Sequence, residues 1–321
     1  MTDDATPNPQ SPPTTQIATR PSWTVLPPVD ERDTTAPSTV LGYLCRKFPR
    51  IPAATWRARM AQGKVIDEHG RVLGLEAPYR AYLKVGYFRE IDTERPIPFE
   101  AQVLFRSPHL LVVDKPPFLP VAPVGRFVNQ CLIYRLEQEL GLKGLAPVHR
   151  LDRLTSGLVL LSADPEARTA YAGLFARREI DKEYVALGHA PEKPQGDRWT
   201  IESVISEGEP WFRRISRPGP EPNSRTEIEL IGWRDGRARF RLKPITGKTH
   251  QLRVHLAGLG YPIVGDPFYP ELQPEQPDDF TSPMALIARQ LRFRDPFSKE
   301  SVRFSSAWTL DRLGFDEASD R

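Results

Sequence analysis

The sequence contains a dense polar motif, HRLDRLTSG, at residues 149–157, directly before an apolar run at residues 158–161. The motif holds one carboxylate, Asp152, between Arg150 and Arg153. Because opposite charges nearby lower the pKa of a carboxyl group, we expect Asp152 to be ionised at neutral pH and suited to act as a nucleophile or base. The charge pattern alone favours a simpler explanation, a structural ion-pair turn, so further motifs are needed to decide.

The chain around this motif mixes strands and helices. The apolar run at residues 110–113 predicts a buried strand, and Asp235-Gly236 predicts a hairpin that joins strands at residues 226–231 and 238–243. A Gly-rich phosphate loop and a regular strand–helix alternation are both missing from the sequence. This argues against a nucleotide-binding Rossmann or P-loop domain.

Apolar residues at helical spacing predict two helices beside these strands. One spans residues 130–140, capped by Asn129 and ended by Gly141. The other begins with Asp164 as its cap and Pro165 at the first helical position.

The N-terminal part of the chain differs in composition. Residues 1–37 contain eight prolines among Thr, Ser, Gln and Asp, which predicts a disordered arm. Residues 38–95 are expected to form a small module. It has a helix that starts after Ser38 or Thr39, a second helix at residues 53–62, and a hairpin around His69-Gly70.

This small module is basic. Residues 38–90 hold ten Lys and Arg residues against four Asp and Glu residues, an excess of six positive charges. Such an excess predicts contact with phosphate, for which Arg57 and Arg59 on the second helix are candidates. The alternative is a solvated basic surface on an accessory domain.

Composition narrows the class of protein. The chain has 321 residues, a net charge of +3 and no stretch of about 18 apolar residues that could span a bilayer. Its N-terminus lacks the features of a secretory signal, so we expect a cytoplasmic location. Cys45 and Cys131 lie in apolar helical patterns and are expected to be buried thiols, which leaves neither a disulfide framework nor a multi-cysteine zinc site.

The motif at residues 149–157 resembles the signature of the RluA-like pseudouridine synthases. Two further stretches follow in the order of that family: Lys182-Glu183-Tyr184, and GKTHQLRVHL at residues 247–256, which runs on to Gly265-Asp266. The resemblance covers about residues 100–304. Helix, helix and hairpin in the basic module also resemble the small RNA-binding module found ahead of such catalytic domains.

The resemblance implies roles for three residues. Asp152 would be the catalytic carboxylate, Tyr184 would stack on the target base, and Arg253 would form a salt bridge with Asp152. These roles agree with physical needs, because an extracted base needs a new stacking surface and a buried carboxylate needs a partner. The candidate RNA-binding residues are Arg150, Arg153, Lys182, Lys248, His250, Arg57 and Arg59.

His250 and His255 suggest a metal site at first sight. Their segment reads as a short helix capped by Thr249, and a five-residue spacing does not stack two ligands on one helix face. We therefore expect no metal there, and a hydrogen bond from His250 that shapes the loop.

The sequence departs from the family pattern at four positions. Phe118 and Ala122 stand where Gly and His are usual, Lys248 replaces an Arg, and Ile287 replaces a His. These changes bear on loop geometry and on substrate subgroup.

The resemblance implies an α+β catalytic domain at residues 96–310, with a mixed, largely antiparallel bent sheet, flanking helices and a central cleft. A short tail at residues 311–321 follows. The implied reaction isomerises uridine to pseudouridine in ribosomal or transfer RNA, with no cofactor or metal, by a monomeric enzyme. Two rival hypotheses are a catalytically silent RNA-binding protein of the same fold and a glycosidase that releases free base.

Overall fold

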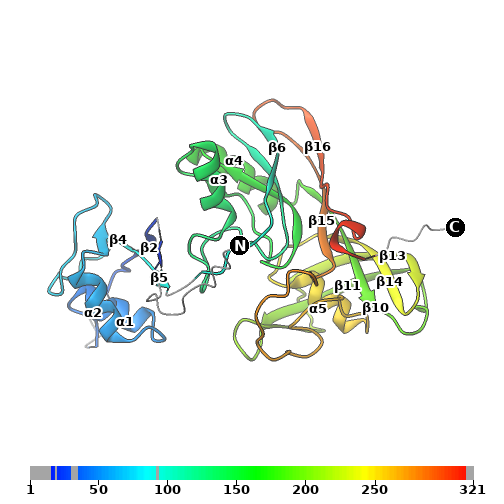
Figure 1. Ribbon diagram of the computed structural model, residues 1–321, viewed down its shortest axis with the longest axis horizontal. Helices are drawn as coiled ribbons and strands as arrows, with labels where there is room; N and C mark the ends of the chain where they lie inside the picture. The colour runs from blue at the N-terminus through cyan, green and yellow to red at the C-terminus, as the bar shows by residue number, and fades with distance from the viewer. Residues whose placement is uncertain (1–15, 19, 30–34, 92–93, 316–321) are drawn as a thin grey trace, which may run out of the picture. The chain divides into compact units, whose positions relative to one another are not determined.

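The computed structural model describes residues 16–18, 20–29, 35–91 and 94–315 (Figure 1). These residues form two compact units. The first comprises the chain up to Arg95 together with Val124–Asn129, and the second comprises the remainder. The parts of the predicted arm and tail at residues 1–15, 19, 30–34 and 316–321 lie outside the described residues. Within the described residues, no helix is long and apolar enough to cross a membrane.

The first unit packs two helices, α1 (Val40–Lys47) and α2 (Ala53–Ala61), on a three-stranded antiparallel sheet. The Thr39 side chain caps α1 by accepting a hydrogen bond from the Gly42 N–H, which confirms one of the two predicted caps. Trp56 and Met60 of α2 are buried in the core, as their helical spacing predicts. The sheet order is β2 (Ser22–Val25), β4 (Lys84–Tyr87) and β3 (Val65–Asp67).

Two predictions for this unit are wrong in part. The predicted disordered arm includes residues that are ordered, because β2 pairs with β4 and Leu26 is fully buried in the core. Pairing across the sheet and burial outweigh the local effect of the prolines. The predicted hairpin is replaced by another pairing. β3 pairs with β4, and Val72, in the predicted second strand, makes only an isolated bridge to Ile66. A short β1 (Gln16–Ile17) pairs with β5 (Glu90–Ile91).

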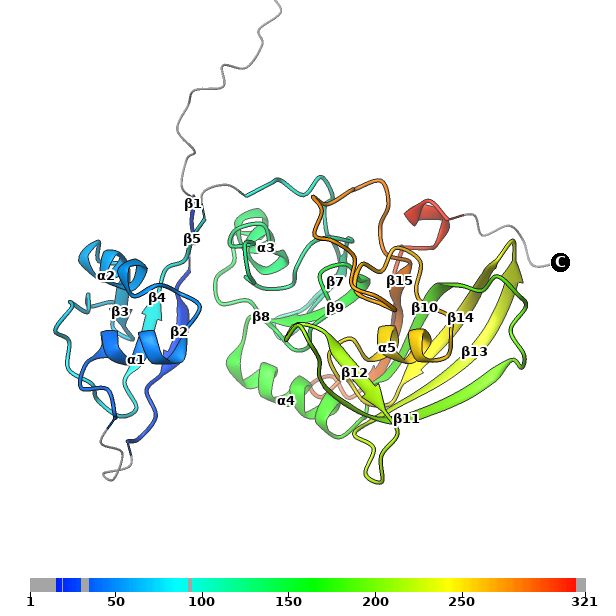
Figure 2. The ribbon, with the colours of Figure 1, turned by 90° about the horizontal axis from the view of Figure 1, so that it is seen from below.

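The second unit is built on one sheet of eleven strands, of which β12, β11, β13 and β14 form one long curved half (Figure 2). The strand order is β12-β11-β13-β14-β10-β15-β9-β7-β6, while β16 pairs with β15 and β8 with β9. The strands are β6 (Gln102–Arg106), β7 (Leu111–Lys115), β8 (Ala146–Pro147), β9 (Ser156–Ser162), β10 (Asp181–His189), β11 (Arg198–Glu207), β12 (Arg214–Arg217), β13 (Ser224–Arg234), β14 (Arg237–Pro244), β15 (Leu286–Arg294) and β16 (Ser301–Ser305).

This sheet agrees with the expected α+β class. Strand pairs are antiparallel except where β9 runs parallel to β15, through Ser156 opposite Ile287 and Gly157 opposite Ala288. The predicted hairpin at Asp235-Gly236 joins β13 to β14. The apolar runs at residues 110–113 and 158–161 are buried as predicted, and the polar residues that complete β7 and β9 are buried as well.

Helices cover this sheet at both halves. α3 (Leu132–Leu140) and α4 (Pro165–Ala176) lie beside β6, β7 and β9, and α5 (Gln251–Gly258) packs against β12, β13 and β14 (Figures 1 and 2). The Asp164 cap of α4 is confirmed by its hydrogen bond from Glu166 N, and Gly141 ends α3 in a left-handed conformation.

Two predicted helix starts are shifted. α3 begins after Cys131 rather than at Gln130, because Cys131 has an extended backbone, with φ of −140° and ψ of 156°. α5 begins after His250 rather than after Thr249, because His250 itself has a left-handed backbone, with φ of 57°. Cys131 is buried as expected, whereas Cys45 is only half-buried.

The C-terminal segment closes the second unit. The predicted tail is partly ordered, because a 3-10 helix at Asp311–Leu313 follows Leu310, and the side chains of Leu310 and Leu313 are buried. Just before it, Ser306 Oγ and Ala307 N both donate to the buried Asp114 carboxylate at the end of β7, each at 2.6 Å. The end of the described chain is thereby fastened to β7, the buried strand next to the edge strand β6.

Candidate active site

The three residues that the motifs single out line one pocket of about 100 Å³ in the second unit. Asp152 lies in the loop between β8 and β9, Tyr184 on β10 and Arg253 on α5. We call this the Asp152 pocket. Four of the candidate RNA-binding residues also line it, namely Arg150, Lys182, Lys248 and His250.

Backbone contacts hold the loop that carries Asp152. The Thr155 N–H donates to the Asp152 carbonyl at 3.1 Å, which closes a tight turn. Leu151 and Leu154 are buried on either side, so the turn is fixed to the core by its apolar residues. His149 accepts a hydrogen bond from Leu160 N at 3.1 Å, and this ties the start of the motif to β9.

A buried lysine anchors the same loop from β7. Lys115 has no exposed surface, and its ammonium donates to the carbonyls of Pro116, Leu119 and Arg153 at 2.8–3.1 Å. Three acceptors use all three of its N–H groups. The carbonyl of the residue after Asp152 is therefore fixed to the end of the buried strand β7.

The glycine that ends the motif is required by packing. Gly157 has φ of 107°, and a Cβ there would lie 2.3 Å from the Ala288 carbonyl oxygen. Any side chain would push β9 away from β15, so only glycine permits this parallel pair. The motif thus encodes both the acid and the strand contact that follows it.

Arg253 forms the predicted salt bridge with Asp152. Its Nη1 lies 3.2 Å from Asp152 Oδ2, and its Nε and Nη2 donate to the two oxygens of Asp266 at 2.7 and 2.6 Å. The side chains of Arg253 and Asp266 are 2% and 0% exposed. Asp266 therefore holds the guanidinium of Arg253 in place through two hydrogen bonds, and the remaining nitrogen, Nη1, faces Asp152.

This arrangement keeps Asp152 ionised. Burial alone would raise the pKa of Asp152, but the positive charge of Arg253 above all, together with that of Arg150, outweighs it and holds that pKa below its usual value. Arg253 fixes only Oδ2. Among the described residues, none donates a hydrogen bond to Oδ1, which leaves this oxygen available to a substrate in the pocket.

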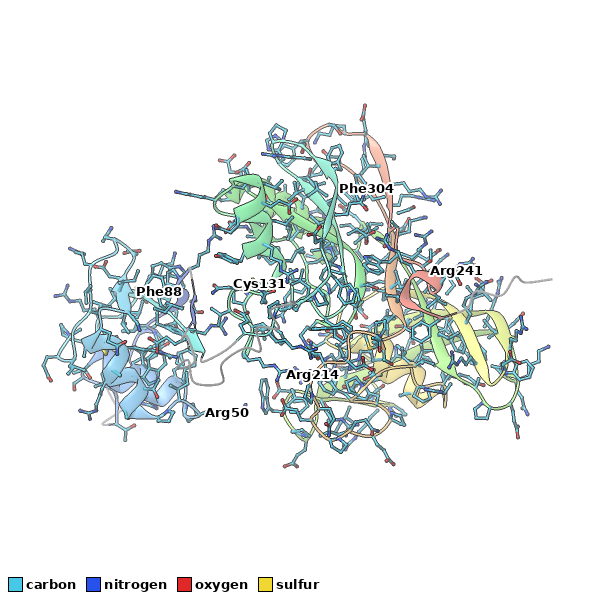
Figure 3. The ribbon with its side chains drawn as sticks, viewed as in Figure 1. Arg50, Phe88, Cys131, Arg214, Arg241 and Phe304 are labelled. Atoms are coloured by element: carbon cyan, nitrogen blue, oxygen red, sulfur yellow. The ribbon has the colours of Figure 1, made fainter. Side chains whose placement is uncertain are left out.

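His250 acts in the neutral form. Burial lowers its pKa to about 4, although the charge of Asp152 opposes the shift. Its Nδ1 lies 2.9 Å from the hydroxyl of Tyr269, which also accepts a hydrogen bond at 2.7 Å from the N–H of Arg214, the residue labelled in Figure 3. This confirms that a His250 hydrogen bond shapes the loop. A neutral ring supplies no positive charge, so a contact of His250 with RNA would be a hydrogen bond rather than an ion pair, and RNA binding by His250 stays a prediction.

The second histidine turns away from the first. His255 Nε2 lies 3.0 Å from Ser203 Oγ, and its Nδ1 lies 2.9 Å from Thr226 Oγ1, both inside the core. The two histidines therefore serve separate hydrogen-bond networks.

Tyr184 offers its ring to the pocket and keeps its proton. Burial and then the negative charge of Asp152 raise the pKa of the Tyr184 hydroxyl. A phenol that stays protonated is unsuited to act as a base at neutral pH, whereas its aromatic face can stack on a planar ligand.

Two of the candidate RNA-binding residues lie elsewhere than expected. Arg153 donates both terminal nitrogens to Asp278 at 2.9 Å, so its guanidinium is directed to a protein carboxylate. Arg59 is only 7% exposed and lies over the Trp56 ring, because its position on α2 faces the core. Arg57, by contrast, is exposed in the first unit.

Sequence reasoning missed the residues that support the pocket. Gln251 receives the Thr246 hydroxyl and the Lys248 N–H on its side-chain oxygen, and its amide donates to Arg225 and Thr226. Asp266 and Tyr269 support Arg253 and His250. Gln251 and Asp266 both stand in the matched motifs. A search of these motifs for a carboxylate partner of Arg253 could have found Asp266.

Of the four departures from the family pattern, Lys248 lines the pocket and Ile287 lies next to it, whereas Phe118 and Ala122 are not among the lining residues. Ile287 is buried in β15, where its neighbour Leu286 lines the Asp152 pocket. Phe118 adopts φ of 64°, a left-handed conformation that suits the usual glycine, and it stacks on Phe99 at 6.1 Å. Lys248 is exposed at the pocket, where it keeps the positive charge of the usual arginine.

Comparison with known proteins places this chain in one family. Residues 109–258 match the family model described as RNA pseudouridylate synthase. A relative from Pasteurella multocida, the dual-specificity RNA pseudouridine synthase RluA, is 34% identical over 205 residues, which cover 62% of this chain and 89% of the relative.

In some other relatives the match covers only a smaller part of the relative's length. The mitochondrial tRNA pseudouridine(32) synthase of Saccharomyces cerevisiae is 34% identical over 184 residues, but the chain spans only 38% of its length. Among solved structures, human RNA pseudouridylate synthase domain containing 1 superposes with a TM-score of 0.55 at 26% identity. That match covers 68% of this chain and 89% of the human one. From the motifs, the sheet and these matches, the chain belongs to the RluA-like family of RNA pseudouridine synthases.

Proposed function

We propose that this protein converts uridine to pseudouridine within RNA, with Asp152 as the catalytic carboxylate. The observation that carries the proposal is the ion pair of Arg253 with Asp152, inside a pocket that Tyr184 also lines. Family membership supports the reaction class. The isomerisation breaks the bond between C1′ and N1 of the uridine, and forms a bond between C1′ and C5 after the base has turned.

The residues of the pocket fit this chemistry. Asp152 Oδ1 can act on the nucleotide as a nucleophile or a base while Arg253 restrains Oδ2. The detached uracil must stay in the pocket while it turns, and the ring of Tyr184 offers it a stacking surface. C5 loses one proton and N1 gains one, so the reaction needs no external oxidant or reductant.

The target uridine is expected in transfer or ribosomal RNA. A yeast relative is named for position 32 of tRNA, which makes a tRNA anticodon loop the first substrate to test. RNA from a deletion strain and its parent should be treated with carbodiimide, and the resistant uridine adducts should be mapped. We expect one or a few adducts to disappear in the deletion strain and to return when purified protein is added. Release of free uracil instead would identify a glycosidase.

The basic first unit is proposed to add affinity that does not depend on sequence. Arg57 on α2 and Arg80 ahead of β4 are both exposed. Changing both to Glu in the full-length chain should weaken RNA binding and flatten the dependence of log affinity on log salt. We expect the slope to fall by about 0.7 to 0.9 for each phosphate that the variant no longer binds.

The matched control changes both residues to Lys, which retains their charge and should retain the slope. Equal slopes for the Glu variant and the wild type would contradict phosphate contact by this surface. A cytoplasmic location stays a prediction, since the name of the yeast relative places that protein in mitochondria. A monomeric state also stays a prediction.

A further inference from the structure

A second hollow adjoins the Asp152 pocket. It has a volume of about 340 Å³, and Lys182 and Pro244 line both cavities. Four cationic side chains line this second hollow: Arg178, Lys182, Lys243 and Arg292. They come from the turn after α4 and from the neighbouring strands β10, β14 and β15. We call this cavity the basic hollow.

The charges in the basic hollow are not balanced within the described part of the chain. None of its four cations makes an ion pair with a carboxylate there. Of its three acids, Glu183 lies 3.7 Å from Arg241 and Glu227 lies 3.6 Å from Arg225. Those two arginines stand outside the hollow, and Figure 3 labels Arg241 on β14. The charges of Glu183 and Glu227 are thus neutralised by arginines outside the hollow. The four cations inside the hollow can therefore bind an external anion.

Lys182 connects the two cavities and is the least solvated of these cations. Its Nζ donates to the Thr246 carbonyl at 3.0 Å, and a Cβ on Gly247 would lie only 4.0 Å from it. Burial, and then the charge of Arg178, lower the pKa of Lys182 to about 8. An anion placed in the hollow would offset both causes and hold the lysine charged.

We propose that the basic hollow binds a backbone phosphate of the RNA strand, next to the nucleotide whose base enters the Asp152 pocket. This inference rests on the proposed function and deepens it, because it gives the strand a path across Lys182. Arginine and lysine on three adjacent strands can contact the oxygens of one phosphate from several sides. The hollow would then position the RNA while the Asp152 pocket selects the base.

Charge reversal in the full-length chain tests this inference. Lys243→Glu and Arg292→Glu, singly and together, are compared with Arg237→Glu. Arg237 lies on the same strand as Lys243, is also exposed, and stands about 20 Å away at the spacing of an extended strand. The probe is a ten-nucleotide oligouridylate, whose affinity is measured across a range of salt concentrations.

We expect the double variant to bind this probe at least about tenfold more weakly, because it can no longer form charged hydrogen bonds with the phosphate. Its salt slope should fall by about 0.7 for each phosphate that it no longer binds. On RNA that the wild type modifies, KM should rise more than kcat falls. Arg237→Glu should leave affinity, slope and KM near the wild-type values.

Three results would overturn the inference: equal weakening by Arg237→Glu, unchanged binding by the double variant, or no binding of oligouridylate by the wild type. Failure of the proposed function looks different. In that case the wild type would restore no adduct in RNA from the deletion strain, whatever the charge variants do to binding.

Discussion

Replacing Asp152 with Asn is expected to lower pseudouridine formation by at least about 1,000-fold, within the range that positioned acid–base groups contribute. The amide keeps the size of the side chain but cannot act as an anion at Oδ1. Turnover should be measured with enzyme in excess over RNA, so that the bond-breaking step is followed directly.

RNA affinity of this variant should stay within about threefold of the wild type, because Asp152 makes little contribution to phosphate contact. The fold should persist as well, since Arg253 keeps its two hydrogen bonds to Asp266. The control is Asp235→Asn, the same change of charge on the exposed hairpin between β13 and β14, which should leave turnover unchanged. Turnover by Asp152→Asn within tenfold of the wild type would remove Asp152 from the mechanism.

Replacing Arg253 with Met is expected to destabilise the protein by about 3–5 kcal/mol, because the buried Asp266 carboxylate loses its partner. The free energy of unfolding in urea measures this effect. The double variant Arg253→Met with Asp266→Leu removes both charges, so it should regain much of the stability. If the single variant loses less than about 1 kcal/mol, the ion pair does not hold α5 at the pocket.

The same variants separate stability from chemistry through pH. In the wild type, Arg253 helps to hold the pKa of Asp152 below its usual value, so the reactive carboxylate is present at neutral pH and is lost as pH falls through that pKa. Without Arg253 the pKa rises, and activity should begin to fall at a higher pH. The stabilised double variant should show this shifted profile too, whereas a purely structural role for Arg253 would restore the wild-type profile along with the fold.

The sequence predicted the residues of the pocket better than the contacts that support them. Asp152, Tyr184 and Arg253 stand in short local motifs that resemble those of a known family, and this resemblance brought them together where the charge pattern alone did not. Asp266 stands at the end of the third motif, yet its pairing with Arg253 depends on how the loop after α5 folds back. A local sequence pattern does not show how close Asp266 comes to Arg253 in the folded chain.

Burial explains the remaining differences. Arg59 reads as a surface cation from charge alone, but the face of α2 that carries Trp56 turns it inward. The strand β2 is concealed by neighbouring prolines, because its stability comes from pairing with β4, about sixty residues later in the chain. Lys115 likewise looks like an ordinary charged residue until its three carbonyl partners are seen.

The parallel pair of β9 and β15 constrains the order in which the protein can be completed during synthesis. Ser156 Oγ donates to the Leu286 carbonyl across 130 residues of sequence, directly after the loop that carries Asp152. While the ribosome makes the intervening segment, β9 has β7 as a full partner and otherwise pairs only with the two-residue β8, at its far end. An open edge on a largely apolar strand readily pairs with other chains. Products that terminate before β15 should therefore aggregate rather than persist as partly active fragments.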